Sequence, residues 1–242
     1  MPYPYDKTDL ANKFSLPSAE HLFGTDDLGR DVFSRLIYGA RYSLQIGFIS
    51  VFTAGILGTL LGSFSGYYGG IVDLIVMRLL DVFQAIPGLI FAIAVCATLG
   101  PGFTNCIISL AVGLIPGYAR LARASILNIR KMEYLEAAES INANVGRIII
   151  KHIIPNILSP LIVQATLDVA NAILVAASLS FIGLGVRPPT PEWGAMLTAG
   201  RDYLRTYPHL VMFPGLTIMI AVISLNMLGD GLRDALDPKL RR

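Results

Sequence analysis

Long stretches without an ionisable side chain are the feature that most limits how this chain can fold. Residues 42–72, 82–119 and 206–229 contain no Asp, Glu, Lys or Arg, and residues 152–186 contain only Asp168. A helix needs about 20 mostly apolar residues to cross the hydrocarbon core of a bilayer. Only 15% of the 242 residues are charged, whereas a soluble domain carries about 25%. The sequence therefore predicts an integral membrane protein and excludes a disordered chain, a disulfide scaffold and most soluble enzymes.

The uncharged stretches predict five membrane-spanning helices. The second stretch is too long for one span, and Gly100-Pro101-Gly102 breaks it. We expect spans near residues 44–67, 75–99, 103–125, 154–183 and 208–229. The Pro-Gly pairs at 87–88 and 214–215 are expected to kink or unwind their spans, and Gly58 and Gly62 predict close helix packing. Because the runs lack the alternation of barrel strands, the predicted fold is an all-α bundle.

Lys and Arg side chains indicate which ends of the spans face the cytoplasm. They gather in the connection 120–152 and in the tail, as Arg120, Arg123, Arg130, Lys131, Arg147, Lys151, Arg233, Lys239, Arg241 and Arg242. By the positive-inside bias, we expect this connection and the C-terminus in the cytoplasm, and a multi-pass protein in the plasma (inner) membrane. Five spans then place the N-terminus outside.

This topology divides the chain into three segments. Residues 1–41 are expected to be extracytoplasmic, with an amphipathic helix at the outer interface that includes Arg30 and Arg35. The start of the sequence has no signal-peptide pattern, so either the first span inserts unaided or the sequence omits an earlier helix. The second segment is a transmembrane domain at residues 42–230, which contains a cytoplasmic coupling loop at residues 130–156. The third is a cytoplasmic tail at residues 231–242.

The motifs of common enzyme and cofactor sites are missing from the sequence. No Gly is followed by Lys, which excludes a P-loop, and neither H-E-x-x-H nor G-x-S-x-G occurs. Cys96 and Cys106 lie in apolar surroundings, and the three histidines match no ligand spacing. We therefore predict no catalytic residue, no metal and no cofactor.

The predicted cytoplasmic connection contains a short helix of its own. Residues 132–141 are good helix formers, and Asn142 and Asn144 end the helix in a turn. Ala137 and Ala138 form a surface that a partner's backbone can approach, between glutamates that can orient the partner. The alternative is a surface turn that binds nothing.

Together with other motifs, this connection is similar to a known family. Glu136-Ala137-Ala138, a turn, and His152-Ile153-Ile154-Pro155-Asn156 resemble the EAA signature of permeases of ATP-binding-cassette (ABC) importers. More narrowly, the chain resembles the second permease subunit of dipeptide, oligopeptide and nickel importers, from about Tyr5 onward. The further matching motifs are H-L-F-G-T-D-D-L-G-R-D at 21–31, L-S-F-I-G-L-G at 179–185, P-P-T-P-E-W-G at 188–194 and G-D-G-L-R-D at 229–234.

The resemblance implies a type I importer permease fold of about five transmembrane helices with a cytoplasmic coupling helix. It implies a translocation path for peptides or a small solute such as nickel. The expected partners are a homologous permease, two cytoplasmic ABC ATPases that hydrolyse the ATP, an extracytoplasmic solute-binding protein and membrane lipid, with no nucleic acid. The residues expected to couple to the ATPase are Glu136, Ala137, Ala138, Ile141 and Asn142. Two departures are Asn142, where the family has Gly, and an expected first span that this sequence lacks.

One charged residue lies within a predicted span. Gln164, Asp168 and Asn171 are spaced at i, i+4 and i+7, which places them on one face of a helix. Intramembrane charges face protein or a water-filled path, so these residues are candidates for the translocation path. The alternative is hydrogen bonding between helices inside the bundle.

Two other classes of function remain open at this point. A self-sufficient secondary transporter or channel needs only a gradient, and an intramembrane enzyme turns over its substrate alone. An ABC permease instead depends on ATPase subunits.

Overall fold

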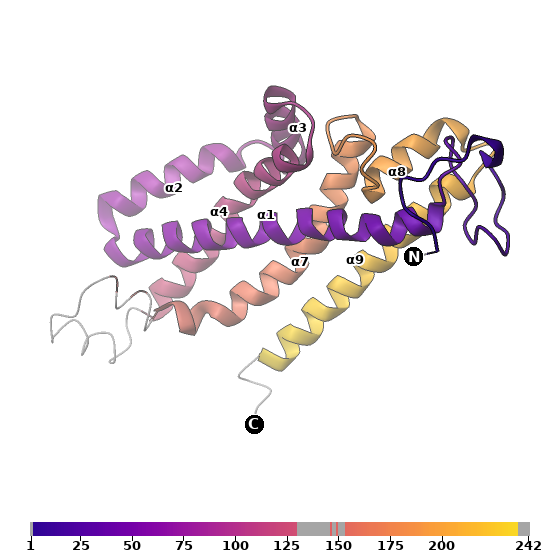
Figure 1. The fold of residues 1–242 in the computed structure, drawn as a ribbon. Helices are drawn as coiled ribbons and strands as arrows, with labels where there is room; N and C mark the ends of the chain where they lie inside the picture. Colours follow the sequence, from indigo (N-terminus) through magenta and orange to yellow (C-terminus); the bar gives the residue numbers. More distant parts are fainter. Residues whose placement is uncertain (1, 130–145, 147–148, 150–152, 237–242) are drawn as a thin grey trace. The chain divides into compact units, whose positions relative to one another are not determined.

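The computed structural model describes residues 2–129, 146, 149 and 153–236 (Figure 1). Helices dominate these residues, and their strand-like pairing is limited to an isolated bridge between Thr25 and Asp31. The prediction of an all-α membrane protein is confirmed.

Four long helices are apolar enough to cross a membrane. They are α1 (Val32–Tyr68), α4 (Phe103–Ile129), α7 (Ile154–Phe181) and α9 (His209–Leu236). The spans expected near 44–67, 103–125, 154–183 and 208–229 each fall on one of them. With 37 residues, α1 is about 55 Å long at 1.5 Å per residue, so it extends beyond a hydrocarbon core of about 30 Å.

The span expected at residues 75–99 is interrupted. Here α2 (Gly70–Gln84) and α3 (Gly88–Leu99) meet at an angle of 84°. Pro87 provides no amide hydrogen and disfavours helical geometry in the residue before it, so the helix ends there. Within the described residues, four helices are thus long and apolar enough to span a membrane, and five spans result if the bent pair counts as one. Pro214, by contrast, lies inside the continuous helix α9.

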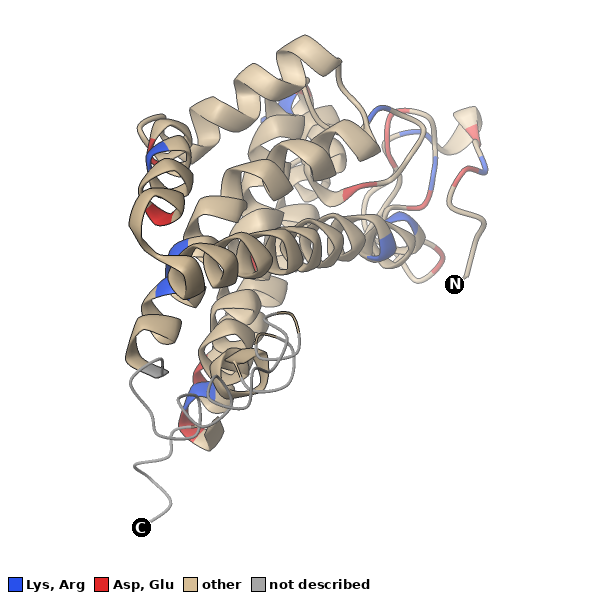
Figure 2. Cartoon of the chain, turned by 90° about the vertical axis from the view of Figure 1, so that its left-hand side faces the viewer, with Lys and Arg blue, Asp and Glu red and all other residues tan. Residues whose placement is uncertain are grey.

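The long helices present apolar side chains on their outer faces. Phe52 on α1, Ile71 on α2 and Met227 on α9 are each at least 70% exposed. Lys, Arg, Asp and Glu are sparse along the long helices (Figure 2). Such surfaces are suited to lipid or to other helices rather than to water.

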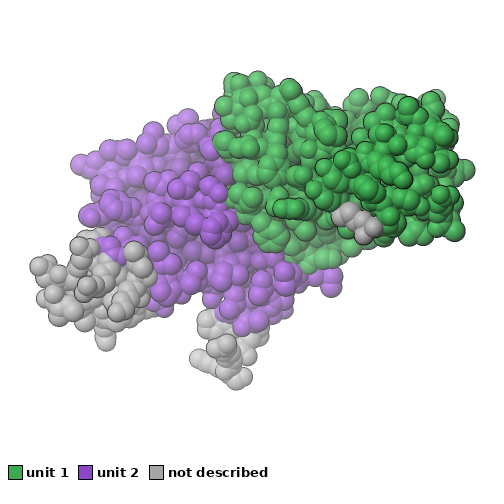
Figure 3. Space-filling view, viewed as in Figure 1, with its two compact units in different colours: residues 1–50, 92–110, 169–225 green, residues 51–91, 111–168, 226–242 purple. Residues whose placement is uncertain are grey.

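The chain divides into two compact units (Figure 3). Each long helix has residues in both units. Unit 1 comprises residues 1–50, 92–110 and 169–225, and unit 2 comprises residues 51–91, 111–168 and 226–242. Unit 1 includes the short helices η1 (Leu10–Asn12), α8 (Trp193–Gly200) and η3 (Arg201–Tyr203).

Close packing of α1 and α4 in unit 2 explains two glycines of α1. A Cβ atom at Gly58 would lie 2.6 Å from the Ile115 carbonyl oxygen, and one at Gly62 would lie 2.0 Å from that of Ala119. Both distances are too short for a side chain. The close packing predicted from Gly58 and Gly62 is therefore confirmed.

The N-terminal segment in unit 1 differs from the expected interfacial helix. Residues 32–41 are the first turns of α1, and the Asp31 carboxylate accepts a hydrogen bond from the Ser34 amide at 2.7 Å, capping the helix. Arg30 and Arg35 are buried, with exposed fractions of 8% and 5%. Their guanidinium groups are paired with Asp26, and the position of the segment at the outer interface stays a prediction.

Candidate translocation and coupling sites

The polar stripe predicted on α7 is partly assembled in the structure. In unit 2, Gln164 Nε2 donates a hydrogen bond to Asp168 Oδ1 at 3.1 Å. Gln164 is exposed and Asp168 is half-buried. Asn171, further along the same helix, belongs to unit 1 and is exposed. The structure therefore joins two of the three predicted path residues and leaves the function of the stripe a prediction.

Tyr118 on α4 is a functional candidate that the sequence analysis missed. Its side chain is 1% exposed, and its hydroxyl has no hydrogen-bond partner among the described residues. Tyr118 shares a pocket with Ala165 of α7, and Asp168 lies about one turn further along that helix. The sequence could have indicated Tyr118, because it lies within a predicted span, directly after Pro116-Gly117. A buried tyrosine hydroxyl usually finds a hydrogen-bond partner.

Tyr118 also lines an apolar pocket within unit 2. The pocket has a volume of about 330 Å³, in the range that holds a small ligand. Its other walls come from α1, for example Val51 and Thr59, and from α7, for example Leu158 and Leu161. This pocket can take an apolar side chain, and Asp168 on the same α7 segment can take a cation.

Two of the arginines whose positions predicted the cytoplasmic side, Arg120 and Arg123, form ion pairs with aspartates. Arg123 on α4 donates two hydrogen bonds to the Asp73 carboxylate on α2, each at 2.5 Å, and Arg120 donates one to Asp81 at 2.6 Å. Neither pair could be foreseen from the charge count, because the partners lie far apart in the sequence.

The motif P-P-T-P-E-W-G in unit 1 surrounds a buried carboxylate. Glu192 is 1% exposed and accepts hydrogen bonds from the Gly194 and Ala195 amides at 2.8 Å, which caps α8. The hydroxyls of Ser43 on α1 and Ser180 on α7 also donate to it, at 3.2 and 2.8 Å. Glu192 therefore ties three helices of this unit together.

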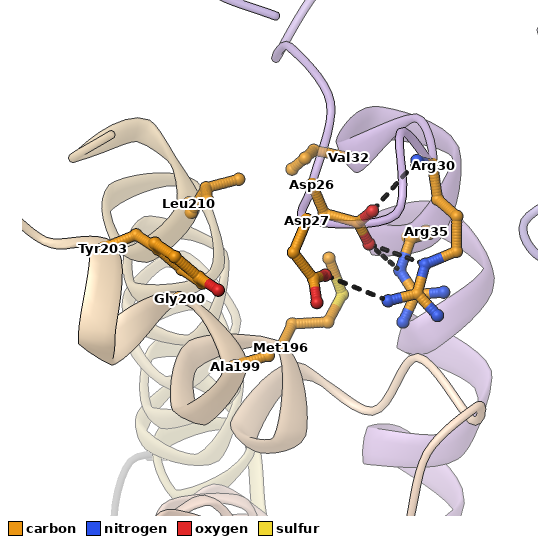
Figure 4. A pocket seen from close by; sticks show the side chains of 10 residues that line it. All are labelled: Asp26, Asp27, Arg30, Val32, Arg35, Met196, Ala199, Gly200, Tyr203 and Leu210. Carbon is orange, nitrogen blue, oxygen red and sulfur yellow. Dashed lines mark hydrogen bonds and ion pairs between the residues drawn. The ribbon is translucent and has the colours of Figure 1, made fainter. Parts of the chain in front are cut away.

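Asp26 is one of the charged residues that line a small pocket in the same unit (Figure 4). Asp26 Oδ2 accepts a hydrogen bond from Arg30 Nε at 2.7 Å and lies 3.5 Å from Arg35 Nε, while Asp27 Oδ1 lies 3.5 Å from Arg30 Nη2. The pocket measures about 30 Å³, which leaves room for no more than a few waters. These charges therefore hold the segment before α1 in place and do not form a peptide site.

The expected coupling residues lie outside the part of the chain that the structure describes. These residues are Glu136, Ala137, Ala138, Ile141 and Asn142. The structure describes the helices on either side, α4 up to Ile129 and α7 from Ile154. The role of the five residues stays a prediction.

The described cysteine, histidine and acidic side chains do not gather into a metal site. Cys96 and Cys106 are free and fully buried, as expected for small apolar side chains. Within residues 2–129 and 153–236, no group of three His, Cys, Asp or Glu side chains is placed to hold a metal ion.

The fold and these sites define a class of protein: a multi-pass helical membrane subunit with a charged residue in a spanning helix and an adjoining pocket. The chain belongs to the family described as "Binding-protein-dependent transport system inner membrane component", which matches residues 58–242. It is a permease subunit of an ABC importer. The predicted family resemblance is thereby confirmed.

Similar proteins include three transport-system permeases. The chain is 49% identical to the dipeptide permease DppC of Alkalihalophilus pseudofirmus, over 98% of this chain and 78% of the relative. It is 47% identical to the di/tripeptide permease DppC of Pseudomonas aeruginosa, over 98% and 81%. It is also 47% identical to the glutathione permease GsiD of Escherichia coli O157:H7, over 98% and 80%.

Solved structures show the same fold. A chain of the inward-facing MetNI methionine ABC transporter aligns with a TM-score of 0.67 at 22% identity, covering 85% of this chain and 97% of its own length. A chain of an amino acid ABC transporter aligns with a TM-score of 0.63 at 16% identity, covering 84% and 95%. The type I importer permease fold is thus confirmed.

Proposed function

We propose that this chain forms half of the translocation path of an importer for dipeptides and other short peptides. The observation that carries the proposal is 49% identity over 98% of the chain to a dipeptide permease. The di/tripeptide and glutathione permeases support the same substrate class, because glutathione is itself a short peptide. Nickel, the other solute expected from the resemblance, serves as the comparison substrate.

In this proposal the partners provide the energy and the substrate. Two cytoplasmic ABC ATPases hydrolyse ATP, since no P-loop occurs in this sequence. An extracytoplasmic binding protein delivers the peptide, and a homologous permease completes the path. The chain lies in the inner membrane with its C-terminus and the connection 120–152 in the cytoplasm, as the distribution of Lys and Arg indicates.

Coupling is assigned to the segment between α4 and α7. Glu136, Ala137, Ala138 and Ile141 dock into a cleft of the ATPase, and Asn142 forms the turn that follows. ATP binding can favour one state of the permease only through contacts that differ between the states. A partner bound between α4 and α7 acts on both helices, because it holds the chain that connects them.

The polar stripe of α7 is assigned to the translocation path. Asp168 meets the amino terminus or a basic side chain of the peptide, with Gln164 holding the carboxylate at 3.1 Å and Asn171 adding a polar contact. The pocket of about 330 Å³ beside Tyr118 receives an apolar side chain. The separation of these two chemistries suits peptides better than a bare cation.

Co-purification with the partner subunits tests the proposal. The permease pair is isolated with its ATPases, and ATPase activity is measured with binding protein loaded with dipeptides, longer peptides, glutathione or nickel. The proposal predicts stimulation by a loaded short peptide and none by nickel. Stimulation by nickel alone, or failure to assemble with ATPases, contradicts it.

A further inference from the structure

Two ion pairs join α2 to α4 within unit 2. Arg123 binds Asp73 through two donors, Nε and Nη2, each at 2.5 Å, and Arg120 Nη2 binds Asp81 Oδ1 at 2.6 Å. The later residue of α2 pairs with the earlier residue of α4, so the two helices run antiparallel along this contact.

The end of α1 joins the same arrangement. Ser65 Oγ donates a hydrogen bond to Asp73 Oδ1 at 2.5 Å, so one carboxylate receives donors from both α1 and α4. A Cβ atom added at Gly66 would lie 3.2 Å from Ile126 Cγ2, so α1 and α4 remain in close contact beyond Gly62. Parts of α1, α2 and α4 therefore form one connected group.

A contribution to stability does not by itself explain the pair Arg120–Asp81. The side chains of Arg120 and Asp81 are 46% and 43% exposed, and exposed ion pairs add little stability. Directional pairs do something that apolar packing does not. Helices in lipid lack a hydrophobic force that fixes their register. The bidentate Arg123–Asp73 pair fixes it geometrically, and the single Arg120–Asp81 hydrogen bond adds a second point along the same contact.

The position of the two ion pairs along α4 indicates a function for the fixed register of α2 against α4. Arg120 and Arg123 lie near the end of α4, which ends at Ile129 and leads into the segment that contains Glu136-Ala137-Ala138. In the proposed function, a displacement of that segment is transmitted to the last turns of α4 as well as to α7. The ion pairs are attached at these turns.

We infer that Asp73–Arg123 and Asp81–Arg120 are positioning pairs that make α2 follow α4 when the ATPase moves the coupling segment. This inference rests on the proposed function. The four side chains do not contact substrate or ATP; they convert a displacement of α4 into a displacement of α1, α2 and α4 together.

The test measures peptide transported per ATP hydrolysed by the reconstituted complex of both permeases, the ATPases and the binding protein. Asp73→Asn and Asp81→Asn are expected to lower this ratio by roughly 2- to 30-fold, the range of coupling changes seen for mutations between sites. Because Arg78 also lies 3.8 Å from the Asp81 carboxylate, the pair is tested by removal of both partners: Arg120→Gln combined with Asp81→Asn is expected to lower the ratio no further than Asp81→Asn alone. Asp202→Asn, which removes an exposed ion pair with Arg201 in unit 1, is the matched control and leaves the ratio unchanged.

The outcomes separate the two proposals. A merely structural role would lower the amount of assembled complex and leave transport per ATP at the wild-type value. The inference is overturned by that result, or by a further loss in the ratio when Arg120→Gln is combined with Asp81→Asn. Because Asp81 is half exposed, its substitution tests coupling even if Asp73→Asn does not assemble. A wild-type complex that no peptide stimulates contradicts the proposed function instead.

Discussion

At the scale of single residues, Asp168 is the most informative side chain. Asp168→Asn keeps the shape and removes the charge that is proposed to meet the cationic part of a peptide. We expect uptake to fall by about tenfold, the effect of losing roughly 1.4 kcal/mol of interaction, with normal assembly of the complex. Radiolabelled dipeptide uptake into proteoliposomes measures this. Wild-type uptake by the variant would assign Asp168 to helix packing.

Tyr118→Phe separates two functions of the residue next to that carboxylate. It removes a buried hydroxyl without a partner among the described residues and keeps the ring that lines the pocket. Assembly and thermal stability should be unchanged within about 0.5 kcal/mol, since no paired hydrogen bond is lost. The apparent KM for peptide, compared with wild type, reports whether the hydroxyl faces the substrate. A loss of more than about 2 kcal/mol in stability would show that the hydroxyl is paired within the bundle.

A glycine provides a prediction about packing at the same scale. Gly62→Leu introduces a Cβ that would lie 2.0 Å from the Ala119 carbonyl oxygen, so α1 and α4 must separate. Overpacking of this kind costs about 1–3 kcal/mol or more. Detergent-solubilised protein should lose thermal stability relative to Gly117→Leu on α4, where no atom lies within 4 Å of the added Cβ. Equal stability of the two variants would contradict the packing seen here.

At the scale of elements, the segment between α4 and α7 is the expected connection to the ATPase. Ala138→Glu places a charged side chain where a partner's backbone is expected to approach, and it should abolish ATP-driven uptake or assembly with the ATPases. Co-purification and uptake are measured together, with Asp202→Asn in unit 1 as the control that leaves both unchanged. If Ala138→Glu leaves both intact, the segment does not couple.

The helices also show what the sequence could reveal and what it could not. Stretches with at most one charged residue, each longer than the roughly 20 residues that a bilayer requires, located the long spanning helices. Pro87-Gly88 and Pro214-Gly215 are the same dipeptide, yet one ends a helix and the other lies within α9. A proline in a spanning helix is tolerated when its surroundings satisfy the freed carbonyl, and the local sequence does not encode those surroundings.

At the scale of the whole molecule, long-range contacts account for most of what the sequence analysis missed. The charge pattern counted Arg120 and Arg123 but could not pair them with Asp81 and Asp73. Likewise, helical spacing placed Gln164 beside Asp168, while the neighbouring Tyr118 belongs to another helix. Local periodicity thus predicted the elements and each one-helix motif, whereas contacts between helices required the fold.

We propose above all that this permease moves short peptides with energy from partner ATPases. Proteoliposomes containing the permease pair are compared with and without the ATPase subunits, with binding protein and labelled dipeptide outside and ATP inside. We expect uptake that requires both the ATPases and ATP and that is unchanged by an imposed proton or sodium gradient. Gradient-driven uptake by the permease pair alone would contradict it and support a self-sufficient transporter.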